Sequence, residues 1–389
     1  MTSPFTRKEL LERAALGGMA LSSGWLAACG GDGIEGGGDD TTETAVERTL
    51  AGTLRISNWP LYIDIDEKTK KRPTLQQFQK EFGVNVRYIE DVNDNDEFFG
   101  KVQAPLKNGQ SIDRDIVVLT DWMAGRMVRL GYVEKVDKET LTNAESNLVD
   151  ALRSPGWDPN RDYSLPWQSG LTGIGYDSSK TGGSVTSASQ LLEDSKLKGK
   201  VAFLTEMPDT IGLLLQDDGK DPTKVDAGDF DTAIQRLQEG VDSGQIRQFT
   251  GNDYSGLLAN GNLWACAAWS GDMVQLIADN AKLRFAIPDK GGMIWTDNML
   301  IPKGGDVFTA STFMDFVYRP KVAAQIEAYV NYIGPVEGAR EEIRAIDPSL
   351  AENELIFPSE ETLAKVKIFD AEAADDADLK EKFQAVIGA

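Results

Sequence analysis

The chain has 389 residues, 41% hydrophobic and 26% charged, an ordinary globular composition with room for two domains. Its formal net charge of −22 repels nucleic acid and favours small cations, although such a charge mainly reports solubility. The sequence contains no histidine, which excludes histidine-based triads, HExxH zinc sites and imidazole acid–base catalysis.

The first 28 residues have the pattern of an export signal. Arg7, Lys8 and Arg13 precede a mostly apolar run over residues 14–28, too short for the roughly 20 residues of a transmembrane helix. The run ends in LAAC, which resembles a bacterial lipoprotein lipobox with Cys29 as the acylated first residue of the mature protein. The earlier stretch TRKELL also resembles a twin-arginine signal, with Lys in the second basic position.

Residues 29–49 are rich in Gly, Asp and Thr, and they predict a flexible tether between the lipid anchor and a body beginning near Leu50. The body keeps one cysteine, Cys266, inside an apolar stretch. We expect no intrachain disulfide and a buried, hydrophobic role for this thiol.

The body opens with a strand at 53–59, a helix with Leu75, Phe78 and Phe82 on one face, and a second strand at 84–88. Thr74 is the expected helix cap, and the order strand, helix, strand predicts a parallel pair. A further strand at 115–119 leads through Thr120 and Asp121 into a helix at 123–130. The stretch DVNDND resembles a calcium loop but lacks its Gly and final Glu, so we expect a helix start instead.

Turn-forming residues over 155–170 predict a hinge or a crossing into a second lobe. That lobe alternates again between strands and helices, and residues 293–301 return as a strand to the first lobe. The predicted elements are a strand at 200–204, helices at 211–216 and 230–240, a strand at 263–269, and helices at 273–281, 313–317 and 322–332. Two α/β lobes joined by crossings place a cleft between them.

Two Trp/Asp pairs, Trp269 with Asp272 and Trp295 with Asp297, stand out in this cleft region. Aromatic residues suit half-buried strands, so a core role competes with a binding role. Asp is poorly suited to a strand interior, and we expect both carboxylates where strands end. An aromatic face attracts a cation and a carboxylate adds a charge-assisted hydrogen bond, so the pairs also fit an alkylammonium group.

Five motifs, in order, resemble the spermidine/putrescine-binding proteins of ABC importers: NWxxYI from Asn58, DIVV from Asp115, DYSLP from Asp162, WSGD from Trp269 and WxD from Trp295. The resemblance runs from about residue 54 to 340. It implies an α/β, two-lobed type II periplasmic-binding fold that closes on its ligand and performs no chemistry. The expected lobes comprise residues 50–167 with 296–343, and 168–295 with 344–389.

The same resemblance implies the binding residues. Thr120 and Trp122 stand where the family has a Ser and a Tyr, and Leu61 stands where relatives often have an acidic residue. Two acidic family positions align with Met207 and Thr210, and the adjacent Glu206 and Asp209 are offset by one residue, which leaves open whether they face the cleft or point away from it. The main candidates are Trp59, Tyr62, Thr120, Trp122, Trp269, Asp272, Trp295 and Asp297, and the secondary ones are Asn58, Glu206, Met207 and Thr210.

The sequence therefore predicts a monomeric, extracytoplasmic lipoprotein that captures a polyamine, without cofactor, metal or nucleic acid, and delivers it to ABC permease subunits. Fewer carboxylates at one end count against spermidine itself, and other cationic amines or amino-acid derivatives remain alternatives. A ligand sensor for a membrane partner is a second class. A carboxylate-based glycosidase is a third, but the sequence names no suitable pair of acids.

Overall fold

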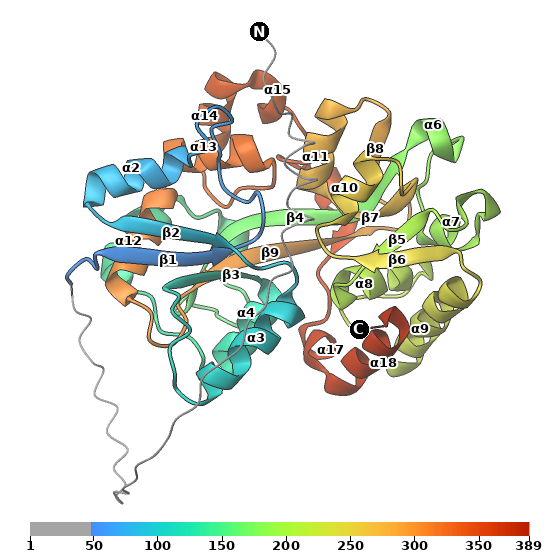
Figure 1. Cartoon of the computed structure of the whole chain (residues 1–389), viewed down its shortest axis with the longest axis horizontal. Coiled ribbons are helices and arrows are strands. Elements are labelled where there is room, and N and C mark those ends of the chain that lie inside the picture. The colour runs from blue at the N-terminus through green and yellow to red at the C-terminus, as the bar shows by residue number, and fades with distance from the viewer. Residues whose placement is uncertain (1–47, 389) are drawn as a thin grey trace, which may run out of the picture.

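The computed structural model describes residues 48–388, which form one mixed sheet with helices on both faces (Figure 1). The predicted signal segment, Cys29 and nearly all of the predicted tether lie outside these residues. Between residues 48 and 388, no helix has the length and apolar character needed to cross a bilayer.

Ten strands form the sheet, and eight of them follow the order β2-β1-β3-β9-β4-β7-β5-β6, with β10 paired to β9 and β8 paired to β4. Their bounds are β1 (Thr53–Asn58), β2 (Asn85–Glu90), β3 (Ile116–Thr120), β4 (Ser164–Asp177), β5 (Val201–Leu204), β6 (Ile246–Thr250), β7 (Ala265–Trp269), β8 (Leu283–Ala286), β9 (Gly292–Leu300) and β10 (Val366–Lys367).

The sheet divides into two parallel groups joined by antiparallel strands. Strands β2, β1 and β3 are parallel to one another, and so are β7, β5 and β6. The long strands β4 and β9 pair with each other between the two groups, and in Figure 1 they run through the centre of the molecule. The two α/β halves predicted from the sequence, and the crossing by β9, are therefore present. The residue boundaries proposed for the lobes stay a prediction.

Helices cover the sheet. Those from the first half and from the stretch after β9 are α2 (Pro73–Phe82), α3 (Asn95–Lys107), α4 (Asp121–Arg129), α5 (Thr142–Asn147), α12 (Val307–Val317), α13 (Pro320–Val330), α14 (Ala339–Ile346) and α15 (Pro348–Ala351). The others are α6 (Ser178–Thr181), α7 (Ala188–Glu193), α8 (Met207–Asp217), α9 (Ala227–Asp242), α10 (Tyr254–Ala259), α11 (Ser270–Asp279), α16 (Glu360–Leu363), α17 (Ala371–Asp375) and α18 (Ala377–Ile387). Three single 3₁₀ turns are η1 (Lys138–Thr140), η2 (Asp150–Leu152) and η3 (Ser195–Leu197).

One of two predicted helix starts differs from the structure. Thr74 does not cap α2, because the helix already begins at Pro73, whose missing N–H suits the first turn. The acidic stretch before α3 does start a helix, and the cap is Asp94, which accepts a hydrogen bond from the Glu97 backbone N–H at 2.9 Å.

The predicted turn region over 155–170 is wrong in its second part. β4 begins at Ser164 and continues for 14 residues, all of them buried. A central strand covered on both faces needs no alternation of apolar and polar residues, and that is why this stretch does not look like a strand. The predicted crossing itself is present, because β4 pairs with β9 along one edge and with β7 along the other.

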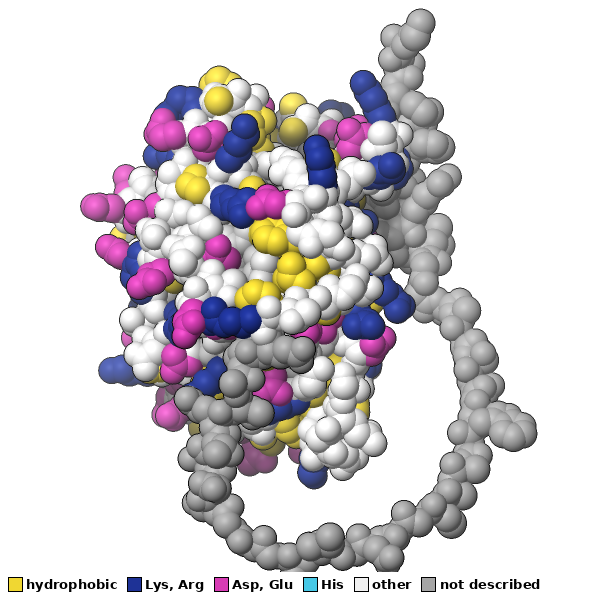
Figure 2. All heavy atoms as spheres, turned by 90° about the vertical axis from the view of Figure 1, so that its left-hand side faces the viewer, with side chains coloured by type: hydrophobic (Ala, Val, Ile, Leu, Met, Phe, Trp, Pro, Cys, Tyr) yellow, Lys and Arg dark blue, Asp and Glu magenta, His cyan; other side chains and the backbone are white. Residues whose placement is uncertain are grey.

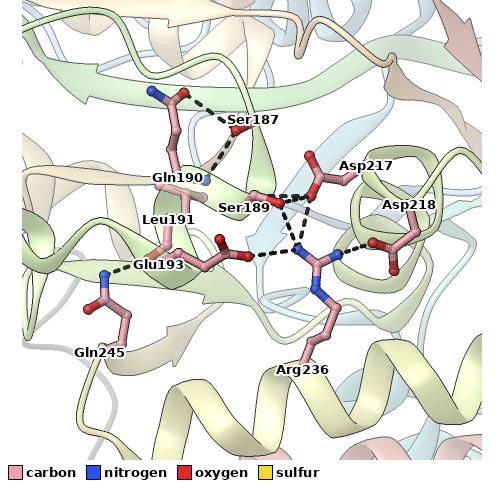
Figure 3. Close-up of polar contacts among 9 residues, drawn as sticks. All are labelled: Ser187, Ser189, Gln190, Leu191, Glu193, Asp217, Asp218, Arg236 and Gln245. Atoms are coloured by element: carbon pink, nitrogen blue, oxygen red, sulfur yellow. Dashed lines mark hydrogen bonds and ion pairs between the residues drawn. The ribbon is translucent and has the colours of Figure 1, made fainter.

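Apolar packing and polar ties hold the layers together. Phe78 of α2 packs edge-on against Phe313 of α12 with ring centroids 5.2 Å apart, and Cys266 is fully buried in β7 as expected. In the second half, Arg236 of α9 lies between Asp217 and Asp218 at the end of α8, with N–O distances of 3.0 and 2.6 Å (Figure 3). This half-buried guanidinium fixes α9 against α8.

The surface carries both signs of charge despite the net charge of −22. On the face seen in Figure 2, acidic and basic side chains are interspersed. Over the described surface as a whole, many charged side chains form ion pairs, as Arg319 does with Glu81 at 2.9 Å. Exposed pairs of this kind contribute little to stability, so the more informative acidic residues are those that lie inside the molecule.

Candidate ligand-binding site

A pocket opens where β1, β3 and β7 end beside β9, the edge at which α/β sheets commonly bind ligands. Its cavity volume of about 60 Å³ suits a slender ligand, since one water needs roughly 10–15 Å³. The walls are formed by Trp59, Pro60, Leu61, Tyr62, Thr120, Asp121, Trp122, Glu206, Pro208, Asp209, Asn252, Trp269, Asp272, Met293, Ile294, Trp295, Asp297, Tyr332, Ile368 and Phe369.

All eight main candidates from the sequence line this pocket, and so does Glu206. Their positions follow from the strands. Trp59 comes directly after β1, Thr120 is the last residue of β3, and Trp269 is the last residue of β7. Asp272 lies in the first turn of α11, directly after β7, as predicted.

Asp297 does not lie at a strand end, and that prediction is wrong. It is inside β9, opposite Thr120 on β3 and Gln168 on β4. The neighbouring strand β3 ends at Thr120, so the side chain of Asp297 reaches the pocket without leaving its own strand. The pocket edge is set by the end of the neighbouring strand.

Three secondary candidates lie outside the pocket walls. The Asn58 carboxamide oxygen accepts the backbone N–H of Trp59 at 2.8 Å. The Thr210 hydroxyl donates to the Leu204 carbonyl at 2.8 Å. Met207 lines a different cavity, beside Phe249. The helix phase explains this result, because Glu206 and Asp209 are three residues apart at the start of α8 and both face the pocket. Of the two directions left open by the sequence, the structure shows the one that faces the cleft.

Aromatic rings form continuous walls. Trp269 has its ring centroid 6.4 Å from that of Trp59 and 6.2 Å from that of Trp295, both edge-on. Tyr332 continues the wall, with centroids 5.6 Å from Trp295 and 5.3 Å from Tyr62. Aromatic faces of this kind pack against methylene groups and attract cations.

Two glycines make room for these walls. A Cβ on Gly170 of β4 would lie 2.4 Å from the indole of Trp295, and one on Gly271 would lie 2.3 Å from the ring of Tyr332. Any larger residue at either position would push a ring toward the cavity, so the two glycines are part of the site.

Five carboxylates face the pocket, and three of them, Asp272, Asp209 and Asp297, accept hydrogen bonds from hydroxyl or indole groups. Asp272 accepts hydrogen bonds from the Tyr254 hydroxyl at 2.8 Å and the Tyr332 hydroxyl at 3.0 Å. Asp209 accepts one from the Trp269 indole N–H at 3.2 Å and one from the Thr172 hydroxyl. Burial raises the pKa of both carboxyl groups to about 6, although these hydrogen bonds act in the opposite direction.

The other three carboxylates are those of Asp121 at the start of α4, Glu206 directly before α8 and Asp297 inside β9. Asp297 Oδ1 accepts a hydrogen bond from the Thr120 hydroxyl at 2.8 Å, and burial raises the pKa of Asp297 to about 7. Burial raises the pKa of Asp121 to about 6 and, with the nearby charge of Asp94, raises the pKa of Glu206 well above its usual value. Raised pKa values in a cleft indicate a site where a positive charge would restore ionisation.

The charge of the lining is one-sided. None of the described residues that line the pocket is a Lys or an Arg. The described part of the chain also contains no cluster of three or more metal-ligating acidic or Cys side chains. Buried carboxylates of one sign need a cation as partner, and aromatic walls suit an organic one.

Sequence reasoning did not include several pocket residues among its candidates. The sequence predicts Asp121 as a helix cap and leaves the direction of Asp209 open. Tyr332 comes from a helix-rich stretch with no motif, and Ile368 and Phe369 come from the C-terminal stretch outside the family resemblance. Only the helical periodicity of α8 could have identified Asp209 as a pocket residue.

Comparison with known proteins gives consistent matches. Residues 74–358 match the family described as bacterial extracellular solute-binding protein. A spermidine/putrescine-binding periplasmic protein of Escherichia coli strain K12 is 26% identical over 313 residues, 80% of this chain and 84% of the relative. A putrescine-binding periplasmic protein of the same strain is 29% identical over 337 residues, 81% of this chain and 85% of the relative.

A solved structure described as a putative spermidine/putrescine ABC transporter from Listeria monocytogenes has the same fold. It superposes with a TM-score of 0.75 at 23% identity, covering 87% of this chain and 98% of that chain. The family resemblance and the two-lobed α/β fold predicted from the sequence are both confirmed.

Proposed function

The chain belongs to the bacterial extracellular solute-binding proteins, and from that premise we propose that it captures a polyamine in the pocket between its two halves. Proteins of this family bind solutes for transport and are not enzymes, which confirms the prediction that the chain performs no catalysis. The names of the E. coli relatives, which bind putrescine or spermidine, support this ligand class.

The observation that carries the proposal is the joint presence of five inward carboxylates and a continuous aromatic wall, with no Lys or Arg among the described residues of the lining. A diamine or triamine places methylene groups on the aromatic faces and ammonium groups beside the carboxylates. A neutral sugar would leave the buried charges without a partner, and an anion would be repelled.

Binding and closure are linked by the position of the pocket. Thr120 and Trp122 come from the first half, Asp209 and Asp272 come from the second, and Asp297 lies on a crossing strand. A ligand that contacts the first half, the second half and the crossing strand makes contacts in the closed state that are absent from an open state. The population therefore shifts toward closure by this difference in affinity.

The cellular role in the proposal is delivery of the bound amine to ABC permease subunits from the outer side of the cytoplasmic membrane. The periplasmic location of the relatives supports it. The lipobox-like LAAC motif supports an anchor on Cys29, which lies outside the described residues. Mass spectrometry of the exported protein checks this part, since acylation adds a diacylglyceryl group to that cysteine.

A thermal-shift panel on the full-length chain tests the ligand class. Putrescine, cadaverine, agmatine, spermidine, choline, γ-aminobutyrate and glucose are compared at equal concentrations. A ligand present at a hundred times its dissociation constant stabilises the folded state by roughly 2.7 kcal/mol, which a melting curve resolves. Stabilisation by one or more diamines or triamines supports the proposal. A shift only with γ-aminobutyrate or glucose overturns it.

A further inference from the structure

Asn95 connects the two halves of the molecule beside the pocket, although the sequence analysis gave it no role. It is the first residue of α3, and only 1% of its surface is exposed. The preceding residue, Asp94, caps the helix, so the side chain of Asn95 is available for tertiary contacts. It uses each of its side-chain hydrogen-bonding atoms.

On the side of the second half, Asn95 contacts Glu206, the residue that precedes α8. Glu206 Oε1 accepts a hydrogen bond from the Asn95 backbone N–H and another from its Nδ2, both at 3.0 Å. The neighbouring residues repeat the connection, because the Thr205 hydroxyl donates to Asp94 Oδ2 at 2.9 Å. Glu206 Oε2 accepts no hydrogen bond from any residue in the described range 48–388, and Glu206 lines the pocket.

On the side of the first half, Asn95 contacts Thr120 at the end of β3. Asn95 Nδ2 donates to the Thr120 hydroxyl at 2.8 Å, and Asn95 Oδ1 accepts the Thr120 backbone N–H at 3.1 Å. The Thr120 hydroxyl in turn donates to Asp297 Oδ1. One continuous chain of hydrogen bonds therefore runs from Glu206 through Asn95 and Thr120 to Asp297.

We propose that Asn95 is a positioning residue that couples occupation of the amine site to closure of the two halves. The inference rests on the proposed function, because Glu206 and Asp297 are two of the carboxylates offered to the ammonium groups. The Asn95 carboxamide orients Glu206 directly and Asp297 through the Thr120 hydroxyl, and both carboxylates line the pocket. A ligand that holds either carboxylate in place strengthens the chain that joins the halves.

An amide is the group that fits this position. Its two N–H bonds reach Glu206 and Thr120 at once, while its oxygen takes the Thr120 N–H. A carboxylate here would face Glu206 with like charge and would lose both donors. A residue with a shorter side chain would leave the buried carboxylate of Glu206 with the backbone N–H alone.

The first experiment is isothermal titration calorimetry of the full-length protein with putrescine. Asn95→Asp keeps the size of the side chain and removes its donors, and Asn93→Asp is the matched control. Asn93 is exposed two residues earlier and acquires the same charge. We expect the Kd of Asn95→Asp to rise at least tenfold and that of Asn93→Asp to stay within twofold. Equal affinities of the two variants overturn the proposal.

The second experiment does not depend on any ligand. Hydrogen exchange of the full-length protein without amine, followed by mass spectrometry, reports on residues 203–211 of the second half. We expect Asn95→Asp to increase deuterium uptake there, because the contact with Glu206 is lost. Adding Glu206→Gln to this variant should recover most of the protection, because the amide introduced at position 206 can donate to the new carboxylate.

This rescue separates coupling from a general loss of packing. If the two substitutions caused unrelated packing defects, their increases in deuterium uptake would add. A restored hydrogen bond instead makes the double variant better protected than Asn95→Asp alone. A double variant less protected than either single variant overturns the proposal. If the parent binds no amine, the proposed function fails, and the exchange result still decides whether Asn95 joins the halves.

Discussion

Asp297 is buried inside β9, where its Oδ1 accepts a hydrogen bond from the Thr120 hydroxyl and its side chain lines the pocket. Replacing Asp297 with Asn removes the charge and keeps the shape. We expect the affinity for putrescine to fall by about 1.5–3 kcal/mol, the range for hydrogen bonds to charged groups. Calorimetric titration measures this loss.

The matched control for this variant is Asp279→Asn, at the exposed end of α11 in the second half. It removes the same formal charge without touching the pocket, so its affinity should stay close to that of the parent. Equal losses in the two variants would mean that the net charge of the molecule, and not a contact with Asp297, attracts the amine.

Single residues of the site differ in how far the sequence reveals them. Trp269 and Asp297 belong to short motifs that combine aromatic and acidic residues, and such motifs can be recognised without a structure. Asn95 and Tyr332 belong to no motif, because their roles depend on which helix and strand ends come together in three dimensions. Whether Asp209 faces the pocket depends on the rotation of α8, because a shift of one residue turns a side chain by about 100° around the helix axis.

At the scale of elements, the pairing of β4 with β9 shapes the aromatic wall. Gly170 lies opposite Trp295 in this pair, and a Cβ there would come within 2.4 Å of the indole. We expect Gly170→Ala to lower the free energy of unfolding by about 1–3 kcal/mol through overpacking, and to weaken amine binding by displacing the ring. Chemical denaturation and calorimetry measure the two effects.

Gly183→Ala serves as the control, because nothing lies within 4 Å of the added Cβ and the residue is exposed. If Gly170→Ala binds putrescine as tightly as this control, the indole moves away without cost, and the position of the Trp295 ring is then unimportant for the ligand.

The C-terminal segment from Ile368 to Ile387 contacts both halves. Asp375 of α17 pairs with Arg126 at 3.1 Å and Arg129 at 2.6 Å, both on α4. Helix α18 packs on α9 of the second half and lies beside α17 in Figure 1. We expect Asp375→Asn to lower the free energy of unfolding by about 1 kcal/mol or less, with a smaller effect in high salt, because the pair is partly exposed.

Denaturation at low and at high salt measures this difference, and Glu381→Gln, an exposed residue of the same segment, controls for the change of charge. A salt-independent loss in Asp375→Asn would contradict an ion-pair origin. The sequence does not assign a role to α17, because its partners on α4 are more than 200 residues earlier in the chain.

The pattern of elements was largely predictable because most strands and helices have regular periodicity. β1 and β2 alternate, and α2 repeats its apolar residues on one face, so their parallel pairing followed. β4 was missed over 164–170 because it contains Pro166 and Gly170 and is covered on both faces. Central strands of this kind lack the signal that reveals half-buried ones.

At the scale of the whole molecule, one sheet runs through both halves, so closure must bend the crossing strands β4 and β9. Their register shifts between Pro166 and Gln168, opposite Asp297. The irregularity in the pairing therefore lies directly beside Asp297, whose carboxylate faces the pocket. A strand that already departs from regular pairing bends at lower cost than a regular one.

Buried carboxyl groups also set how the stability of the whole molecule depends on pH. Burial raises the pKa of Asp272 to about 6, that of Asp297 to about 7 and that of Glu327, on α13, to about 8. In the unfolded chain these groups titrate near pH 4, so between pH 4 and 8 the folded state binds more protons than the unfolded state. The contribution of these groups to stability is therefore complete below about pH 4 and is lost as pH rises through 6 to 8.

A bound diamine should reverse part of this loss. Its ammonium groups favour ionised Asp272 and Asp297, so the rise in Tm caused by saturating putrescine should be larger at pH 8 than at pH 5. Glu327 lies outside the pocket lining, so Glu327→Gln should raise the Tm at pH 8 and leave the putrescine-induced shift unchanged. Melting curves at pH 5, 6, 7 and 8 with and without putrescine measure both quantities. A ligand-induced shift that is constant across this range would mean that the amine does not contact the titrating carboxylates, since only direct contact makes proton release part of binding.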